Sequence, residues 1–288
     1  MPRRLTPVLA AIAAGAVLYF PTLSGLVTQW WNEPDSSYGL LLVAVAALVV
    51  YRRRDALRSA PLAPRDAGFA AIAIGLLVFM AGTITGDVFI LRVSMPLVIA
   101  GAVLVLGGAQ HLRLLRAPLG LVLLAIPLPA VVVTHATMPL QLIASQVAAG
   151  VLHACQIDVV REGNLLMLNR VTLEVADVCS GLRSLVSLLS VAAVCAAFFS
   201  MSAKRAALLM LAAIPIAIIG NGFRVAATGI LATWFGEVAA RGVIHDATGY
   251  AAFIAMCAVV VAIQISIKRF GNGRVAAPSA PAPMAPAA

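Results

Sequence analysis

The sequence predicts an all-α polytopic membrane protein with about eight transmembrane helices and a small β-hairpin-like insert before the sixth helix. Two observations predict this class. Of the 288 residues, 62% are hydrophobic and only 11% are charged, and the mean hydropathy is +1.03. Soluble domains contain about 25% charged residues. The composition therefore excludes an ordinary soluble domain and favours several membrane spans.

The chain contains eight apolar runs that approach the length of about 20 residues needed to cross a bilayer. The run at 38–51 is short. Residues 136–155 form an amphipathic stretch that either lies on the membrane surface or packs between spans. The predicted spans are residues 8–28, 38–51, 67–86, 88–108, 117–134, 182–202, 206–235 and 247–267.

We expect a single multi-span domain over residues 1–270. The first apolar run follows Met1-Pro-Arg-Arg, and with so many spans behind it we interpret it as an uncleaved helix rather than a signal peptide. Residues 271–288 are rich in Ala and Pro and are predicted to be disordered, because they cannot bury a core.

The net charge of +9 is explained by membrane orientation, without a nucleic-acid partner. By the positive-inside rule, both termini are cytoplasmic and the loops after the first, third, fifth and seventh spans face outward. These outward loops contain Glu33, Asp35 and Asp87 near the start of the chain. The termini and the alternate loops hold 14 of the 20 Lys and Arg: Arg3, Arg4, Arg52, Arg53, Arg54, Arg58, Arg65, Arg113, Arg116, Lys204, Arg205, Lys268, Arg269 and Arg274.

The largest outward loop is predicted at residues 135–181, with a patch of short strands in its second half. Val171, Leu173 and Val175 alternate with more polar residues, which is the period of a half-buried strand. Such a patch would place Cys179 at the outer end of the sixth predicted span. The strands are expected at 157–161, 165–168 and 171–177, with turns at 162–164 and 169–170.

Cys179 is the candidate nucleophile. It lies just ahead of a predicted helix N-terminus, with Ser180 beside it and Arg183 one turn further on. Unpaired backbone N–H groups and a nearby guanidinium favour a thiolate. A structural cysteine is the alternative, and Cys155 is a competing outward thiol. Cys195 and Cys257 fall within spans as packing residues. Without a C-x-x-C spacing, neither a zinc site nor a disulfide framework is indicated, and no metal or cofactor is predicted.

Arg224 lies inside the seventh predicted span, where an arginine costs about 2.5–3.5 kcal/mol on insertion scales and so needs a compensating role. It is roughly 26 Å along the helix from Ala207, near the outer edge of the hydrocarbon layer. Asn221 lies three residues earlier and shares its face. The alternative is that Arg224 reaches to lipid head groups.

His245 is predicted in the outward loop before the eighth span. It is a candidate general base, with Asp246 as a possible orienting partner. The outward histidines His135 and His153 compete with it, whereas His111 faces inward. Topology alone thus predicts that the thiol, the imidazole and the guanidinium meet at the outer face, an arrangement suited to nucleophile activation and oxyanion stabilisation.

Arg92 is a second arginine within a span, near the outer end of the fourth. An ion pair with Asp87 and the binding of a substrate carboxylate are two candidate roles, and a structural role is the favoured interpretation.

Several motifs resemble those of the exosortases. The segment Val175-Ala176-Asp177-Val178-Cys179-Ser180-Gly181-Leu182-Arg183-Ser184 is similar to their cysteine motif, and Asn221-Gly222-Phe223-Arg224 is similar to their N-x-x-R motif. His245 occupies the place of their histidine. Ile126-Pro127-Leu128-Pro129, Met138-Pro139-Leu140-Gln141 and Glu162-Gly163-Asn164 resemble segments that precede the cysteine, and the likeness covers most of residues 30–265.

The resemblance implies a bacterial inner-membrane cysteine protease or transpeptidase with its active site facing the periplasm. Cys179, His245 and Arg224 would be catalytic, supported by Asn221, Arg183, Ser180 and Asp246. Its partners would be the lipid bilayer and exported proteins with a C-terminal signal of a Pro-Glu-Pro motif, one membrane span and a basic end, in systems that accompany exopolysaccharide production. The acceptor nucleophile is unknown.

The sequence departs from the family at Ser36-Ser37-Tyr38-Gly39, where relatives often have a Ser-His-Gly-like sequence. Two other classes of function stay open. A transporter or lipid-linked glycan enzyme would use Arg92 and Arg224 for an anionic substrate and would tolerate loss of Cys179. A non-catalytic envelope scaffold would tolerate loss of any one of the three candidate catalytic residues.

Overall fold

The computed structural model describes residues 5–169, 171–175, 181–236 and 242–272. Within these ranges the chain is mostly helical, with one small sheet between the seventh and eighth helices. The elements are α1 (Leu5–Asn32), α2 (Tyr38–Arg52), α3 (Arg54–Ser59), α4 (Ala67–Thr85), α5 (Val88–Leu106), α6 (Ala109–Leu124), α7 (Ala130–Ala154), β1 (Val159–Glu162), β2 (Leu165–Leu168), β3 (Thr172–Glu174), α8 (Leu182–Phe198), α9 (Ala203–Phe235) and α10 (Gly242–Asn272).

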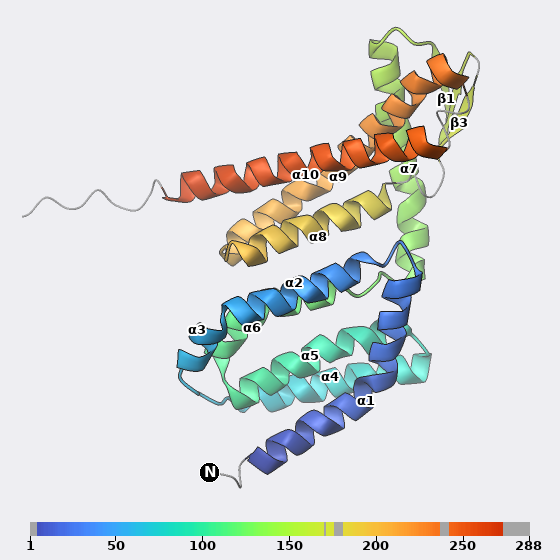
Figure 1. Ribbon diagram of the computed structural model, residues 1–288. Coiled ribbons are helices and arrows are strands. Elements are labelled where there is room, and N and C mark those ends of the chain that lie inside the picture. The colour runs from blue at the N-terminus through green and yellow to red at the C-terminus, as the bar shows by residue number, and fades with distance from the viewer. Residues whose placement is uncertain (1–4, 170, 176–180, 237–241, 273–288) are drawn as a thin grey trace, which may run out of the picture.

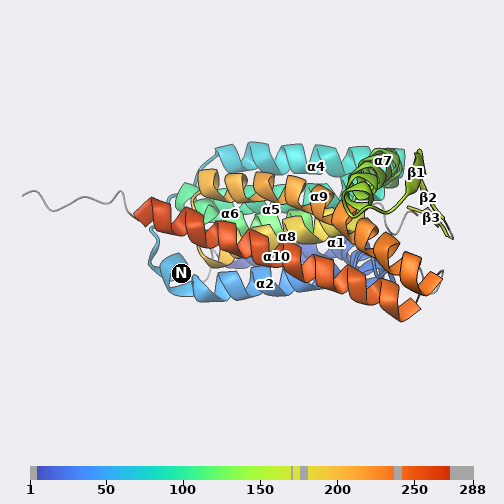
Figure 2. The same cartoon turned by 90° about the horizontal axis from the view of Figure 1, so that it is seen from above.

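Most of the long helices run side by side along one axis, and α7 runs across them at one end (Figures 1 and 2). The sheet lies at that same end. Helix α1 changes direction within its length (Figure 1) and contains Pro21, which lacks a backbone N–H and breaks helix hydrogen bonding. Residues 136–155 lie within α7 and its C-terminal turn, and α7 packs against α9.

Five of the described helices, α4, α5, α7, α9 and α10, are long and apolar enough to cross a membrane, and α2 and α8 are shorter apolar helices. This confirms a multi-pass helical protein but not a count of eight spans. The predicted span at 117–134 does not exist as one helix: α6 ends at Leu124 and α7 begins at Ala130. Pro127 and Pro129 explain the break, because proline cannot donate a helix hydrogen bond and biases the preceding residue toward extended backbone.

The loops gather at two ends of the bundle. The start of α1, the turn between α8 and α9 and the end of α10 share one end with α3, and the sheet and the start of α10 lie at the other (Figure 1). At the first end Arg53 donates from Nη1 to the Leu114 carbonyl at 2.6 Å and from Nη2 to Ser200 Oγ at 3.2 Å, joining α2, α6 and the end of α8. We call these the basic end and the sheet end.

The three strands form an antiparallel sheet in the order β1-β2-β3, which confirms the predicted strand patch. The turn between β1 and β2 contains Gly163 with φ +61°, a conformation that favours glycine. After β3 the chain is held at Val175, whose N–H donates to the Asn164 carbonyl at 3.0 Å. Val175 is only 1% exposed, so the strand patch ends on an anchored residue just before residues 176–180.

The sheet packs on a small core built from α7 and α9. Ala144, Ala148 and Leu152 of α7 are buried with Leu166 of β2 and Ala226 of α9. The two helices approach closely because α9 presents glycine at the crossing: a Cβ on Gly222 would lie 2.5 Å from Val147. Small residues permit this kind of close helix packing in membranes. The sheet-end half of α9 is therefore held rigidly against α7.

Two further cores hold the parallel helices together. One joins α1, α2, α6 and α8 around Leu26, Leu42 and Leu121, and the other joins α8, α9 and α10 around Leu188, Leu209 and Val260. Near the sheet end, the Trp30 indole N–H donates to the Ala125 carbonyl at 2.9 Å, which fixes the end of α1 to the end of α6. Helix α9 thus packs on α7, α8 and α10, and its side chains can meet groups from each.

Candidate functional site

Arg224 and His245 are in direct contact. Nη2 of Arg224 lies 3.1 Å from Nε2 of His245, across the interface between α9 and α10. A guanidinium can only donate, so the contact requires the Nε2 atom to accept and to carry no proton. His245 lies in the first turn of α10, which begins at Gly242, rather than in the loop predicted before an eighth span at 247. The pair brings a permanent cation and an imidazole together at the sheet end.

Arg224 retains unused donor capacity at this position. Its Nε atom is buried and has no hydrogen-bond partner among the residues that the structure describes. Gly249, one turn after His245 on α10, leaves the space that the guanidinium occupies: a Cβ at that position would lie 3.2 Å from Arg224 Nε and 3.3 Å from Nη2. A buried donor without a partner is uncommon in proteins and is suited to bind an oxygen of a bound molecule.

Asn221 is buried, with 1% of its surface exposed, and it contacts the start of α8. A Cβ on Gly181 would lie 2.7 Å from Asn221 Nδ2 and 2.9 Å from its Cγ. Gly181 also has φ +89° and precedes the first residue of α8, so both its backbone conformation and its contact require glycine. This contact brings the N-terminus of α8 against the same helix that carries Arg224.

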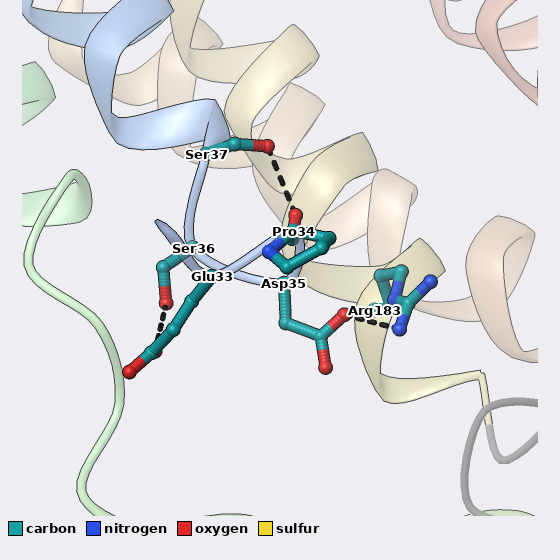
Figure 3. A network of polar contacts seen from close by, with 6 residues as sticks. All are labelled: Glu33, Pro34, Asp35, Ser36, Ser37 and Arg183. Atoms are coloured by element: carbon teal, nitrogen blue, oxygen red, sulfur yellow. Dashed lines mark hydrogen bonds and ion pairs between the residues drawn. The ribbon is translucent and has the colours of Figure 1, made fainter. Parts of the chain in front are cut away.

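Arg183, in the first turn of α8, forms an ion pair with Asp35 in the turn between α1 and α2 (Figure 3). The turn is ordered by its own side chains: Ser37 Oγ donates to the Pro34 carbonyl at 2.9 Å, and Ser36 Oγ donates to Glu33 Oε2 at 3.2 Å. The positive charge of Arg183 is therefore balanced by Asp35, a partner that the sequence prediction did not assign.

Cys179 and Ser180 lie outside the described residues, which resume at Gly181. Asp246 is exposed, and it follows His245 directly on a helix, where adjacent side chains point in different directions. The competing thiol Cys155 is exposed.

The competing histidines are separate from the Arg224–His245 pair. His135 and His153 are exposed on α7. His111 contacts the carbonyls of Gly107 and Leu57 at the basic end. No cluster of His, Cys, Asp or Glu suited to a metal ion occurs in the described part of the chain.

Three residues of this arrangement went unrecognised in the sequence. From the sequence, Gly181 is predicted only as part of the cysteine motif and Asp35 only as an acid in an outward loop, and Gly249 has no predicted role. Gly249 lies four residues after His245 and therefore on the same face of the helix. This spacing is the signal in the sequence that indicates a glycine beside Arg224, which contacts the imidazole.

A family model of transmembrane exosortases matches residues 30–262 of the chain, which includes Arg224, His245 and the cysteine motif. The chain belongs to the transmembrane exosortase family. Comparisons with curated proteins and with solved structures gave no match. As an exosortase, the protein is a multi-pass membrane protein, and its family suggests a membrane peptidase or transpeptidase that acts on exported proteins.

Proposed function

We propose that this exosortase is a cysteine transpeptidase that cleaves the C-terminal sorting signal of exported proteins through a thioester intermediate. The proposed substrate signal is a Pro-Glu-Pro motif followed by one membrane span and a basic end. We further propose that the protein lies in the bacterial inner membrane with both termini in the cytoplasm and the site facing the periplasm, in a system linked to exopolysaccharide. The contact between Arg224 and His245 is the observation that carries the proposal.

Cys179 is the proposed nucleophile. It precedes Gly181 by two residues, and two residues of chain span at most about 7 Å. Gly181 packs on Asn221, three residues before Arg224 on α9. This connectivity supports a site in which the sulfur reaches the imidazole and the guanidinium.

In the proposed reaction the Cys179 thiol gives its proton to His245, and the sulfur attacks the carbonyl carbon of the scissile peptide. Nε2 of His245 accepts a hydrogen bond from Arg224 in the resting site, so protonation there removes this acceptor. The freed Nη2 donor and the unpartnered Nε donor of Arg224 then stabilise the tetrahedral oxyanion. The C–N bond breaks as His245 protonates the leaving amine, and an acceptor amine or water resolves the thioester.

The decisive experiment traps a substrate on Cys179. A membrane-reconstituted Cys155→Ala protein, which lacks the exposed competing thiol, is incubated with a sorting-signal substrate and no added amine acceptor. The expected product is a covalent adduct that hydroxylamine releases. The additional change Cys179→Ala should abolish both adduct and processing at normal protein level, and processing that survives this change would exclude the mechanism.

A further inference from the structure

A second candidate site lies at the sheet end, and neither Arg224 nor His245 is among its lining residues. It is a cavity of about 700 Å³ between the end of α1, the start of α5 and the linker from α6 to α7. Its walls include Gln29 and Asn32 of α1, Phe89 and Arg92 of α5, and Leu128 of the linker. Arg224 and His245 are not among the residues that line it, so their proposed roles in the reaction do not explain this cavity.

Arg92 is the buried cation of the cavity. Its residue surface is only 8% exposed, and its Nη1 donates to Oε1 of Gln29. Gln29 is held in this orientation because its amide donates to Glu33 Oε2 at 2.6 Å. The Nε atom of Arg92 is buried and finds no hydrogen-bond acceptor among the described residues. Asp87, the partner considered from sequence, instead caps α5, accepting from the N–H groups of Phe89 and Ile90 at 2.8 and 3.1 Å.

A buried guanidinium without a carboxylate in salt-bridge contact is unfavourable, so the cavity is suited to a ligand that brings an anion to Arg92. The same cavity is also lined by two carboxylates, Glu33 and Asp87. One cation and two anions give these three side chains a formal charge of −1. A ligand that is only anionic would meet this excess of negative charge, whereas a zwitterion satisfies both signs.

The depth and the rim of the cavity indicate a lipid. Arg92 lies four residues into α5, about 6 Å from its start, which is the thickness of a lipid headgroup layer on one side of a bilayer. Three large apolar lining residues are exposed: Val88 is 50%, Leu128 39% and Val131 61% exposed. These side chains can contact acyl chains, whereas a peptide carboxylate on Arg92 would leave both acids without a cation.

We propose that this cavity binds the headgroup of a zwitterionic aminophospholipid, with the phosphate on Arg92 and the ammonium beside Glu33 and Asp87. The inference concerns a cavity that neither Arg224 nor His245 lines, and it does not depend on the proposed reaction.

The test is lipid titration of the full, delipidated protein in detergent, read by native mass spectrometry. Phosphatidylethanolamine should bind at least about tenfold more tightly than phosphatidylglycerol, since charge-assisted hydrogen bonds are among the strongest. Arg92→Gln should weaken the binding of both lipids at least about tenfold, because both would place their phosphate on Arg92. Arg161→Gln is the matched control, because Arg161 lies on β1 and donates to the Gly163 carbonyl at 3.0 Å, away from the cavity.

A second variant keeps the proposal testable if Arg92→Gln fails to fold. Glu33→Gln removes one negative charge and should narrow the preference for phosphatidylethanolamine by weakening its binding and strengthening that of phosphatidylglycerol. Equal affinity of the unaltered protein for both lipids would overturn the proposal. The proposal would also be overturned if Arg92→Gln weakened the binding of an acetylated glutamyl peptide but left the binding of both lipids unchanged.

Discussion

Asp35 pairs with Arg183, and this ion pair joins the turn between α1 and α2 to the first turn of α8 (Figure 3). Arg183 follows Gly181 by two residues, and Gly181 packs on Asn221. The start of α8 is therefore held from two sides, by a charge on the α1–α2 turn and by a side chain of α9. Both side chains of the pair are at least half exposed, so its expected role is orientation rather than stability.

Reversing this ion pair tests that role. Asp35→Arg and Arg183→Asp should each lower substrate processing at least about fivefold, the equivalent of about 1 kcal/mol, while changing the free energy of unfolding by less than about 1 kcal/mol, as is typical of exposed pairs. The double reversal restores opposite charges and should recover at least half of the activity. A double variant no better than either single one would show that the pair does not position α8.

Arg224 provides the second prediction. Arg224→Lys should reduce the rate of processing by about 10²–10³-fold, the range seen on removal of an oxyanion donor, because an ammonium lacks the planar fork that contacts His245 Nε2. Single-turnover kinetics in reconstituted membranes would measure this change. A lysine variant within a few-fold of the unaltered rate would mean that only the charge at this position is needed.

Gly181→Ala should destabilise the protein and reduce processing. Gly163→Ala is the matched control: Gly163 also has positive φ, but a Cβ there would meet nothing within 4 Å. Both variants share the backbone strain, and only Gly181→Ala pushes against Asn221. The free energy of unfolding in detergent should therefore fall by about 1–3 kcal/mol more for Gly181→Ala. An equal decrease in the free energy of unfolding for the two variants would show that the Gly181–Asn221 contact does not stabilise the site.

Gly249→Ala separates stability from activity. Alanine is about 1 kcal/mol better than glycine inside a helix, so the free energy of unfolding should be unchanged or higher. The new Cβ lies close enough to the Arg224 guanidinium to displace it by a few tenths of an ångström, and processing should fall several-fold. Gly120→Ala in α6, where a Cβ meets nothing within 4 Å, should leave processing unaltered. Full processing activity of Gly249→Ala would contradict the proposal that the space at Gly249 positions the Arg224 guanidinium.

Hydropathy and charge predicted the helical class, most helix positions and the small sheet, because those depend on local composition and period. Pro127 and Pro129 are the signal in the sequence for the break between α6 and α7, whereas the apolar character of 117–134 by itself predicts one continuous span. The crosswise course of α7 was not predictable, because the length and hydropathy of a helix do not determine its angle to the neighbouring helices.

For the candidate site, topology predicted that Arg224 and His245 would share one end of the bundle, and the structure brings them into contact. Sequence could not identify Asp35 as the partner of Arg183, because two exposed residues in distant segments show no common pattern. The sequence shows that Gly249 shares a helix face with His245, but its contact with Arg224 depends on how α9 and α10 face each other.

The strand patch ends at Val175, whose N–H donates to the Asn164 carbonyl, and Gly181 packs on Asn221. Because both of these positions are anchored, the number of residues between them limits how far Cys179, the proposed nucleophile, can lie from Gly181. One inserted residue adds up to about 3.5 Å of tether, as large as the separation from which a nucleophile attacks. A single inserted residue between Val175 and Gly181 should therefore abolish substrate processing, even though every proposed functional group is retained.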